Sequence, residues 1–247
     1  MIKILVIGET CTDRFIYCEA ARFSPEAPVP VLTPIEIKTN AGMSGNVVAN
    51  LKSLSDDLEV TMFHQDEFII KTRYVEKKSN HMFIRFDEGE SCIIGLAMSD
   101  AKKEMIKNFD IVIVSDYDKG FISNEVLKEI GSSAKLSILD SKRKLTKEIT
   151  SSYTFVKLNE NEANSNQDLM GSENLIVTLG SRGCMYMGKT YSSPKPQETI
   201  DVSGAGDMFT ASFILKYFDT KDIEKSIIYA NEMSSIVVSK RGVATPK

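Results

Sequence analysis

The sequence of 247 residues contains no tryptophan, only two histidines and only four cysteines. Both histidines are isolated in the sequence, so we expect packing or surface roles for them rather than metal ligation. The cysteines lack the spacing of a metal site and are flanked by apolar or small residues, which favours buried thiols over disulfides. These cysteines are Cys11, Cys18, Cys92 and Cys184.

The chain also lacks a strong charge excess and a long apolar run. Its 30 lysines and arginines oppose 34 acidic residues, giving a net charge of −4, so nothing indicates a nucleic-acid or anionic membrane surface. No run approaches the roughly 20 apolar residues of a membrane span. The apolar start at 3–8 (KILVIG) is short and ends in Gly-Glu, which predicts a strand rather than a signal sequence. We therefore expect a soluble, cytoplasmic protein that binds neither nucleic acid nor membranes.

Short apolar runs alternate with helical patterns along most of the chain. Strands that are apolar throughout and alternate with helices predict an α/β fold, with a mostly parallel sheet covered on both faces. The predicted strands lie at 3–8, 111–116, 136–140, 153–159 and 174–180, and the predicted helices at 44–54, 99–108, 123–131, 160–168 and 222–240. In such folds the ligand binds outside the carboxyl ends of the strands. The polar residues expected at that edge are Glu9, Asp13, Asp116, Asp140, Asn159 and Thr178.

Two stretches, about 14–38 and 69–88, interrupt this alternation with period-2 patterns typical of antiparallel strands. They leave the α/β core at the expected ligand edge, which favours a small β-sheet lid inserted into a single domain of residues 1–247. An ordinary edge hairpin is the alternative. Strands with exposed edges often pair across a two-fold axis, so a homodimer through the lid is a further hypothesis.

The stretch DVSGAGD (201–207) places small residues and then an aspartate at the start of an apolar helix. Small residues let the backbone approach a ligand closely, and the helix N-terminus offers N–H groups to a phosphate. Asp207 would lie beside that phosphate, where it could take a proton from an alcohol attacking a γ-phosphate. The alternative for Asp207 is helix capping alone.

DVSGAGD resembles the signature of the ribokinase-like (PfkB) carbohydrate kinases. The resemblance extends over nearly the whole chain, and SPEAPVPV, SDYDKG and the C-terminal stretch are similar to a narrower branch, the D-glycero-D-manno-heptose 7-phosphate kinases of bifunctional ADP-heptose synthases. The further stretches that carry it are RFSPEAPVPVL (22–32), GMSGNVVANLKSL (42–54), KTR (71–73), FIRFD (83–87), VSDYDKG (114–120), DSKR (140–143), KLNENE (157–162), VTLGSRG (177–183) and YANEMSSIVVSKRGVAT (229–245).

For catalysis, the resemblance implies that Gly204, Ala205 and Gly206 form an anion hole and that Asp207 is the base. It also implies Mg²⁺, positioned through water by Asn159 and Glu162, for which a helix cap is the alternative. Asn159 would also contact ATP, together with six further residues, which are Lys142, Thr178, Gly180, Gly183, Asn231 and Gly242. The alternatives are a hairpin turn for Thr178, Gly180 and Gly183, helix packing or turn geometry for Asn231 and Gly242, and a surface position for Lys142.

On the sugar side, the resemblance implies that Asp13 binds hydroxyls, although a turn-forming aspartate is the alternative. The alternation of lid residues puts Lys71 and Arg73 on one face, where with Arg85 they would suit a substrate phosphate. A solvated basic face is nearly as consistent with this pattern. The remaining candidates are Gly42 and Asn46 at the start of a helix, and Asp116 and Lys119, which would line the cleft unless Asp116 is a structural cap.

The sequence departs from the family in two places. Met43 stands where relatives have the second of two glycines, and around 58–68 the chain has roughly thirty residues fewer and returns almost directly to the lid. We therefore expect an ATP-dependent kinase that phosphorylates the anomeric hydroxyl of a heptose 7-phosphate, as in ADP-heptose biosynthesis. A kinase of another sugar or sugar phosphate, or a non-catalytic sugar or nucleotide binder, is the alternative.

Overall fold

The computed structural model describes residues 1–194 and 204–238, and its larger sheet is mostly parallel. Neighbouring strands from β4 to β10 run parallel, while β11 and β12 are antiparallel additions at one edge. The order is β12-β11-β10-β9-β8-β7-β1-β4. The bounds are β1 Ile2–Gly8, β4 Leu58–Phe63, β7 Ile111–Asp116, β8 Ser137–Ser141, β9 Phe155–Asn159, β10 Leu175–Thr178, β11 Cys184–Tyr186 and β12 Lys189–Tyr191.

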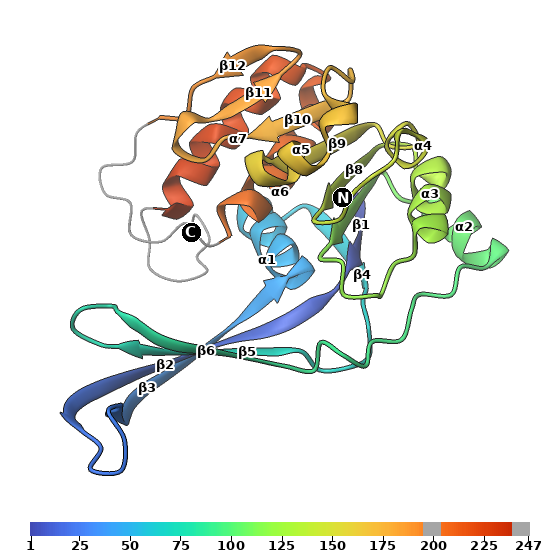
Figure 1. The fold of residues 1–247 in the computed structure, drawn as a ribbon. Helices are drawn as coiled ribbons and strands as arrows, with labels where there is room; N and C mark the ends of the chain where they lie inside the picture. The colour runs from blue at the N-terminus through green and yellow to red at the C-terminus, as the bar shows by residue number, and fades with distance from the viewer. Residues whose placement is uncertain (195–203, 239–247) are drawn as a thin grey trace.

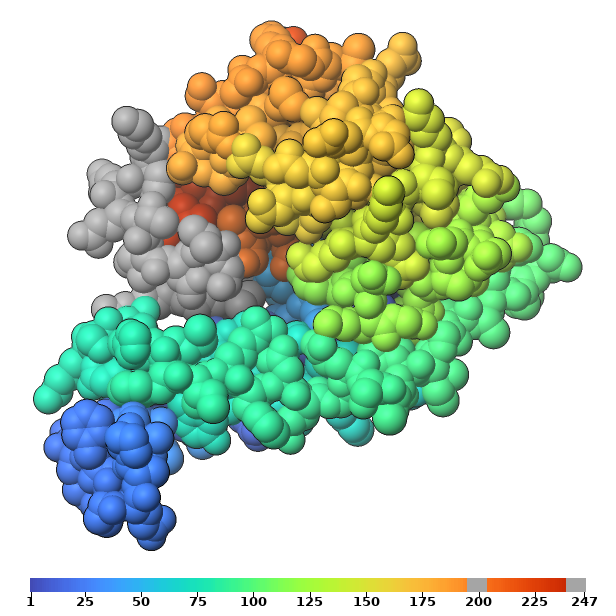
Figure 2. Space-filling view, viewed as in Figure 1, coloured from blue at the N-terminus to red at the C-terminus, as the bar shows by residue number. Residues whose placement is uncertain are grey.

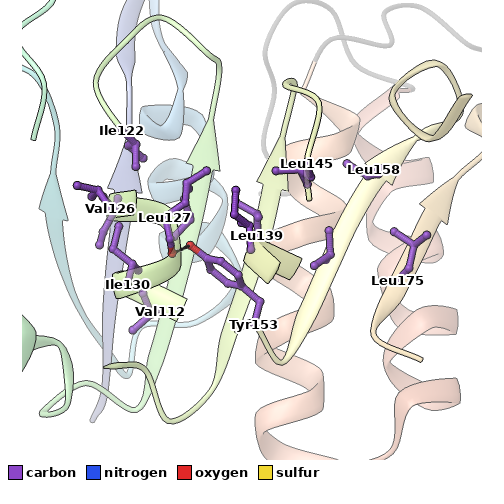
Figure 3. Close-up of a cluster of buried hydrophobic side chains, with 14 of the residues drawn as sticks. Val112, Ile122, Val126, Leu127, Ile130, Leu139, Leu145, Tyr153, Leu158 and Leu175 are labelled. Carbon is purple, nitrogen blue, oxygen red and sulfur yellow. Dashed lines mark hydrogen bonds between the residues drawn. The ribbon is translucent and has the colours of Figure 1, made fainter. Parts of the chain in front are cut away.

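Helices cover both faces of this sheet, as the continuous apolar strands predict (Figure 1). Alternate residues of β1 show why: Ile4 and Val6 pack in one core cluster, and Leu5 and Ile7 in the other. The first cluster lies under α1 Ser44–Leu54, α6 Ala205–Thr220 and α7 Ile223–Val238. The second, part of which is drawn in Figure 3, lies under α2 Asp100–Ile106, α3 Asn124–Ser133, α4 Lys147–Thr150, α5 Glu160–Ser165 and the 3-10 turn Gln167–Leu169.

Two elements differ from the sequence-based expectations. Sequence reasoning missed one strand before the return to the lid, because Leu58–Phe63 forms β4, which pairs in parallel with β1 and is followed by β5 at Ile70. Its β-prone residues complete the edge of the large sheet. The helix predicted over 160–168 ends at Ser165 and continues only as a 3-10 turn.

Of the four thiols expected to be buried, Cys92 is exposed.

The segments expected as lid strands form a separate four-stranded sheet (Figure 1), and the surface of these segments, in blue and teal, lies along one side of the molecule (Figure 2). It is ordered β3-β2-β5-β6, with β2–β3 and β5–β6 antiparallel and β2–β5 parallel. Its first two strands reach beyond the expected range of 14–38 at both ends. The bounds are β2 Thr10–Phe23, β3 Pro30–Met43, β5 Ile70–Glu76 and β6 Met82–Glu88.

The small sheet is attached where a ligand is expected. Only Glu9 separates β1 of the large sheet from β2 of the small one, and β3 runs directly into α1. One face of the small sheet is thereby held opposite the carboxyl ends of the large sheet's strands. Within the described ranges, no helix is both long and apolar enough to cross a membrane.

Candidate active site

Two cavities meet at the N-terminus of α6. The large-sheet cavity, of about 490 Å³, lies among the ends of β8–β10 and the helices α6 and α7. The small-sheet cavity, of about 360 Å³, lies between the small sheet and the large one. The residues that line both are Tyr117, Lys142, Gly204 and Asp207, and we call this meeting point the junction.

Asp207 is a buried carboxylate in the first turn of α6. One oxygen accepts a hydrogen bond of 2.6 Å from the amide of Asn46, and the other accepts one of 3.3 Å from the hydroxyl of Tyr117. Burial, followed by the nearby carboxylate of Asp140, raises the pKa of Asp207 to about 6. A group with this pKa is ionised at neutral pH and can still accept a proton, which suits a general base.

The turn before Asp207 depends on glycine. Gly204 precedes α6 with a φ of +81°, a conformation that side chains with a Cβ rarely adopt. Gly204, Ala205 and Gly206 all line the large-sheet cavity at the helix N-terminus, and backbone N–H groups at such a terminus can bind an anion. A Cβ on Gly206 would lie 3.1 Å from the Nζ of Lys157. The turn therefore combines close backbone approach with a neighbouring cation.

Sequence reasoning missed Lys157 and listed Asp140 only as a polar strand end. The two side chains are buried, 2.8 Å apart, and line the large-sheet cavity, and Thr210 also donates to Asp140. Although burial opposes it, the Asp140 carboxylate raises the pKa of Lys157, which keeps the ammonium charged. A charged residue inside an otherwise apolar run, as in YTFVKLN, was the available signal.

The predicted nucleotide residues Thr178, Gly180, Gly183 and Asn231 all line the large-sheet cavity. Gly183 has a φ of +91°, and a Cβ there would lie 2.0 Å from the carbonyl oxygen of Tyr191. The Asn231 amide donates to the same carbonyl at 3.0 Å, so it also fixes the cavity wall. Gly242, also predicted to bind nucleotide, lies outside the described residues.

Asn159 and Glu162 form a capping box at the start of α5, which is the alternative that the sequence left open. Asn159 also lines the large-sheet cavity, and the carboxylate of Glu162 lies 3.6 Å from the Nζ of Lys142. Among the described residues, no group of three or more His, Cys, Asp or Glu side chains could hold a metal ion.

The small-sheet cavity brings together seven of the eight predicted sugar-site residues, namely Asp13, Gly42, Asn46, Lys71, Arg73, Arg85 and Lys119. Strand register explains part of this, since Asp13 on β2 pairs with Lys71 on β5, and Lys71 pairs with Asp87 on β6. Paired residues share a face of the sheet. Gly42 allows β3 to approach this group, because a Cβ there would lie 2.2 Å from a carboxylate oxygen of Asp13.

The cations of the small-sheet cavity are already ion-paired. Lys71 lies 3.1 Å from Asp87 and also contacts Glu90, whose other oxygen lies 2.6 Å from the Nζ of Lys119. Asp87 in turn accepts two hydrogen bonds of 2.8 Å from the guanidinium of Arg85. A further pair joins Arg73 to Asp13. Sequence reasoning weighed the cations and missed the two acids Asp87 and Glu90, which the stretch FIRFDEGE displays beside them.

The eighth predicted residue, Asp116, lines neither cavity. Its buried carboxylate accepts hydrogen bonds of 2.6 and 2.7 Å from the guanidinium of Arg143 and one of 2.6 Å from Ser141. The expectation that Asp116 lines the cleft is therefore corrected in favour of its structural alternative. The chain turns directly after Asp116, with Asp118 at a φ of +56°. It is Tyr117, and not Asp116, that lines the junction.

Comparisons with known proteins find relatives that are similar over nearly the whole chain. The bifunctional protein HldE of Campylobacter jejuni subsp. doylei is 31% identical over 288 positions, covering 97% of this chain and 62% of that protein. HldE of Helicobacter pylori is 30% identical, covering 99% of this chain and 64% of its own length. This chain thus spans less than two thirds of these relatives. The first alignment has more positions than this chain has residues, so that relative contains residues absent here.

Among solved structures, the ribokinase of Arabidopsis thaliana, complexed with ribose and ATP, superposes with a TM-score of 0.69. It is 18% identical and matches 98% of this chain and 94% of its own, which establishes the ribokinase-like fold. The model of the pfkB family carbohydrate kinases matches residues 64–247. The chain therefore belongs to the pfkB family of carbohydrate kinases, phosphotransferases that act on an alcohol group of a sugar.

Proposed function

We propose that this protein transfers the γ-phosphate of ATP to the anomeric hydroxyl of D-glycero-D-manno-heptose 7-phosphate, giving the 1,7-bisphosphate. The observation that carries the proposal is Asp207, which lies at the junction of two cavities with a pKa of about 6. One cavity would hold ATP and the other the sugar. The similarity to HldE proteins supports the heptose, and the ribokinase solved with ribose and ATP supports the pairing of sugar and nucleotide.

In this mechanism, Asp207 accepts the proton of the sugar hydroxyl as the hydroxyl oxygen attacks the γ-phosphorus. The bond between the γ-phosphorus and the β,γ-bridging oxygen breaks, and ADP leaves. The backbone N–H groups at Gly204–Gly206 would stabilise charge on the transferred phosphoryl group, because they point from a helix N-terminus and need no reorganisation. Lys142, which lines both cavities, brings a positive charge to the same point.

Mg²⁺ fits the residues present only as an ion shared with the nucleotide. In kinases Mg²⁺ is commonly held by one or two carboxylates, substrate phosphates and water rather than by a protein cage. Glu162 and Asn159 would hold it through water, although the capping box engages part of both side chains. When bound, Mg²⁺ neutralises charge on the phosphates.

The small-sheet cavity supports a phosphorylated substrate. Lys71, Arg73, Arg85 and Lys119 line it, and Lys142 adds a fifth cation at the junction. Arginine forms two-pronged hydrogen bonds with phosphate, and its charge persists at any physiological pH. Asp13, whose carboxylate lies close to Gly42, would accept hydrogen bonds from sugar hydroxyls. Another sugar phosphate is the second candidate, since Met43 contributes a large side chain to this cavity.

The test is ADP release with a panel of sugars presented with and without a phosphate group. We expect the highest kcat/KM for heptose 7-phosphate, lower values for other sugar phosphates, and the lowest for unphosphorylated sugars. A higher kcat/KM for another sugar phosphate would change the proposed substrate and leave the proposed reaction unchanged. Preference for an unphosphorylated sugar would overturn the assignment of the cation cluster.

We also propose a homodimer through the small sheet. Strand register puts Ile37, Ile84 and Phe86 on the face opposite the cavity, and all three are exposed. An apolar sheet face of this kind is suited to contact with a second copy of itself. Light scattering at micromolar concentration should give twice the mass of the chain, and Ile84→Lys should give the monomer mass. A monomeric wild-type protein would remove this proposal.

A further inference from the structure

Tyr117 occupies a position that the mechanism above does not use. Its side chain lines both cavities, and its hydroxyl donates the 3.3 Å hydrogen bond to Asp207. The Nζ of Lys142 lies 4.6 Å from the centre of its ring, within the range of a cation–π contact. Tyr117 therefore contacts two of the other three residues of the junction.

The loop that carries Tyr117 is fixed by a buried acid. Glu9, fully buried after β1, accepts hydrogen bonds from the backbone N–H groups of Tyr117 at 2.9 Å, Lys119 at 3.1 Å and Phe121 at 3.2 Å. Backbone N–H groups converge in this way where successive residues alternate in the sign of φ, and here Asp118 and Gly120 have φ values of +56° and +99°.

The buried carboxylate of Glu9 and the loop that carries Tyr117 stabilise each other. A buried carboxylate is costly unless its oxygens are hydrogen-bonded, and three donors provide that compensation. The loop gains in turn, since it would otherwise bury N–H groups without acceptors. β1 and β7 are neighbouring strands, with Gly8 opposite Ser115, so Glu9 and the loop start from the same edge of the sheet. The position of Tyr117 is thus set by the rigid core.

We propose that Tyr117 is a positioning residue for Asp207 and that Glu9 holds Tyr117 in place through the backbone of residues 117–121. The inference rests on the proposed function only in treating Asp207 as the base. The hydroxyl would help to keep the carboxylate facing the junction and would stabilise its ionised form.

Several other groups face Asp207 and set the baseline for a test. Asp140 on β8 favours the protonated form of Asp207, whereas Lys157 on β9, Lys142 after β8 and the Asn46 amide on α1 favour the ionised form. Cys11 on β2 is also close to Tyr117, and burial raises the pKa of this thiol to about 12, so it is neutral. Replacement of Tyr117 by phenylalanine leaves these groups unchanged and removes one hydrogen-bond donor.

The experiment compares the pH dependence of kcat/KM in wild type, Tyr117→Phe and Tyr153→Phe. Tyr153 is the matched control, because its buried hydroxyl donates at 2.7 Å to the carbonyl of Leu127 in the core cluster of Figure 3, away from the junction. We expect Tyr117→Phe to move the acid limb upward by about 0.5–1 pH unit and to lower kcat several-fold. Tyr153→Phe should leave the limb unchanged.

A titration without substrate separates this inference from the proposed function. The ¹³C carboxyl signal of Asp207, assigned by its loss in Asp207→Asn, should titrate near pH 6 in wild type and higher in Tyr117→Phe. A raised midpoint in a protein without sugar kinase activity would support the contact and overturn the function. An unchanged midpoint in an active enzyme would overturn the positioning role. Glu9→Gln should raise the midpoint similarly and speed hydrogen exchange in 117–121, and unchanged exchange would overturn the role of Glu9.

Discussion

The walls of the two cavities are built from different parts of the chain. The large-sheet cavity is lined mainly by turns, helix termini and small residues such as Gly180, Ser181, Gly183 and Ala205. The small-sheet cavity is lined mainly by residues of strands, and most of these are charged and paired with one another. One wall is therefore largely backbone, and the other largely side chain.

This difference follows from the two sheets. In the large sheet, the cavity lies at strand ends, where glycines with positive φ let the backbone itself form the wall. In the small sheet, the cavity faces the sheet surface, where every second residue points inward and strand register decides which charges meet. We infer that a single side-chain substitution affects sugar binding strongly and nucleotide binding weakly.

The largest effect is expected at the junction, which serves both cavities. Asp207→Asn removes the proton acceptor and keeps the shape, so we expect kcat to fall by about 10²–10⁴-fold, the usual contribution of a general base. ATP turnover with saturating sugar phosphate is the measurement. A loss of only a few-fold would contradict catalysis at the junction and favour a protein that binds both ligands without reacting them.

The same variant has a stability signature. Because the pKa of Asp207 is raised in the folded state, ionisation of this group costs stability above pH 6, and the cost disappears as the pH falls toward 4. At pH 7 the cost is at most about 3 kcal/mol. Asp207→Asn should therefore leave the melting temperature unchanged or raise it at pH 7, which excludes unfolding as the cause of lost activity.

The next largest effect is expected from a charged residue in the small-sheet cavity. Arg85→Ala should raise the KM for the phosphorylated sugar by about 10- to 100-fold, the scale of one charged hydrogen-bonded contact, and leave the KM for ATP unchanged. Arg14→Ala is the matched control. Arg14 lies in the same sheet at similar exposure, pairs with Glu88 and points to the opposite face. If both variants raised the KM for the phosphorylated sugar equally, the effect would not depend on which face of the sheet carries the arginine, and the proposed sugar site would be contradicted.

A smaller effect, graded by pH, follows from Asp207. Only the ionised carboxylate accepts a proton, so kcat/KM should fall tenfold for each pH unit below about 6. If the aspartate had its ordinary pKa near 4, kcat/KM would stay unchanged down to about pH 5. A profile that is flat between pH 5 and 7 would therefore contradict either the burial of this carboxylate or its role as the base.

Much of the fold could be predicted because its signals are local. The apolar runs identified the central parallel strands, and the period-2 stretches identified the small sheet. β4 was missed because Leu58–Phe63 mixes apolar and polar residues and lacks the continuous apolar run of the central strands. The end of α5 at Ser165 was also missed, since helix termini carry weaker signals than helix centres.

The site divides in the same way. Residues inside a motif, such as Asp207 and Gly204, could be predicted from the sequence, because a strained turn and a helix start leave a local pattern. Glu90 and Lys157 leave weaker signals, because their roles depend on partners 29 and 17 residues away, Lys119 and Asp140. Asp116 shows the opposite error, since its partner Arg143 is 27 residues away and turns a motif residue into a structural one.

The smallest effect should come from replacing a side chain in the wall of the large-sheet cavity, which is formed largely by backbone. Thr178→Val keeps the shape and removes a hydroxyl whose hydrogen bond to the carbonyl of Leu158 is long, at 3.4 Å. We expect the KM for ATP to change less than about threefold, near the lower limit for one neutral hydrogen bond. Gly183→Ala is the comparison, because its Cβ would displace the backbone at Tyr191 and should raise the KM for ATP more. If Thr178→Val instead raises that KM tenfold, ATP is recognised by side chains as the sugar is, and the contrast between the two cavities fails.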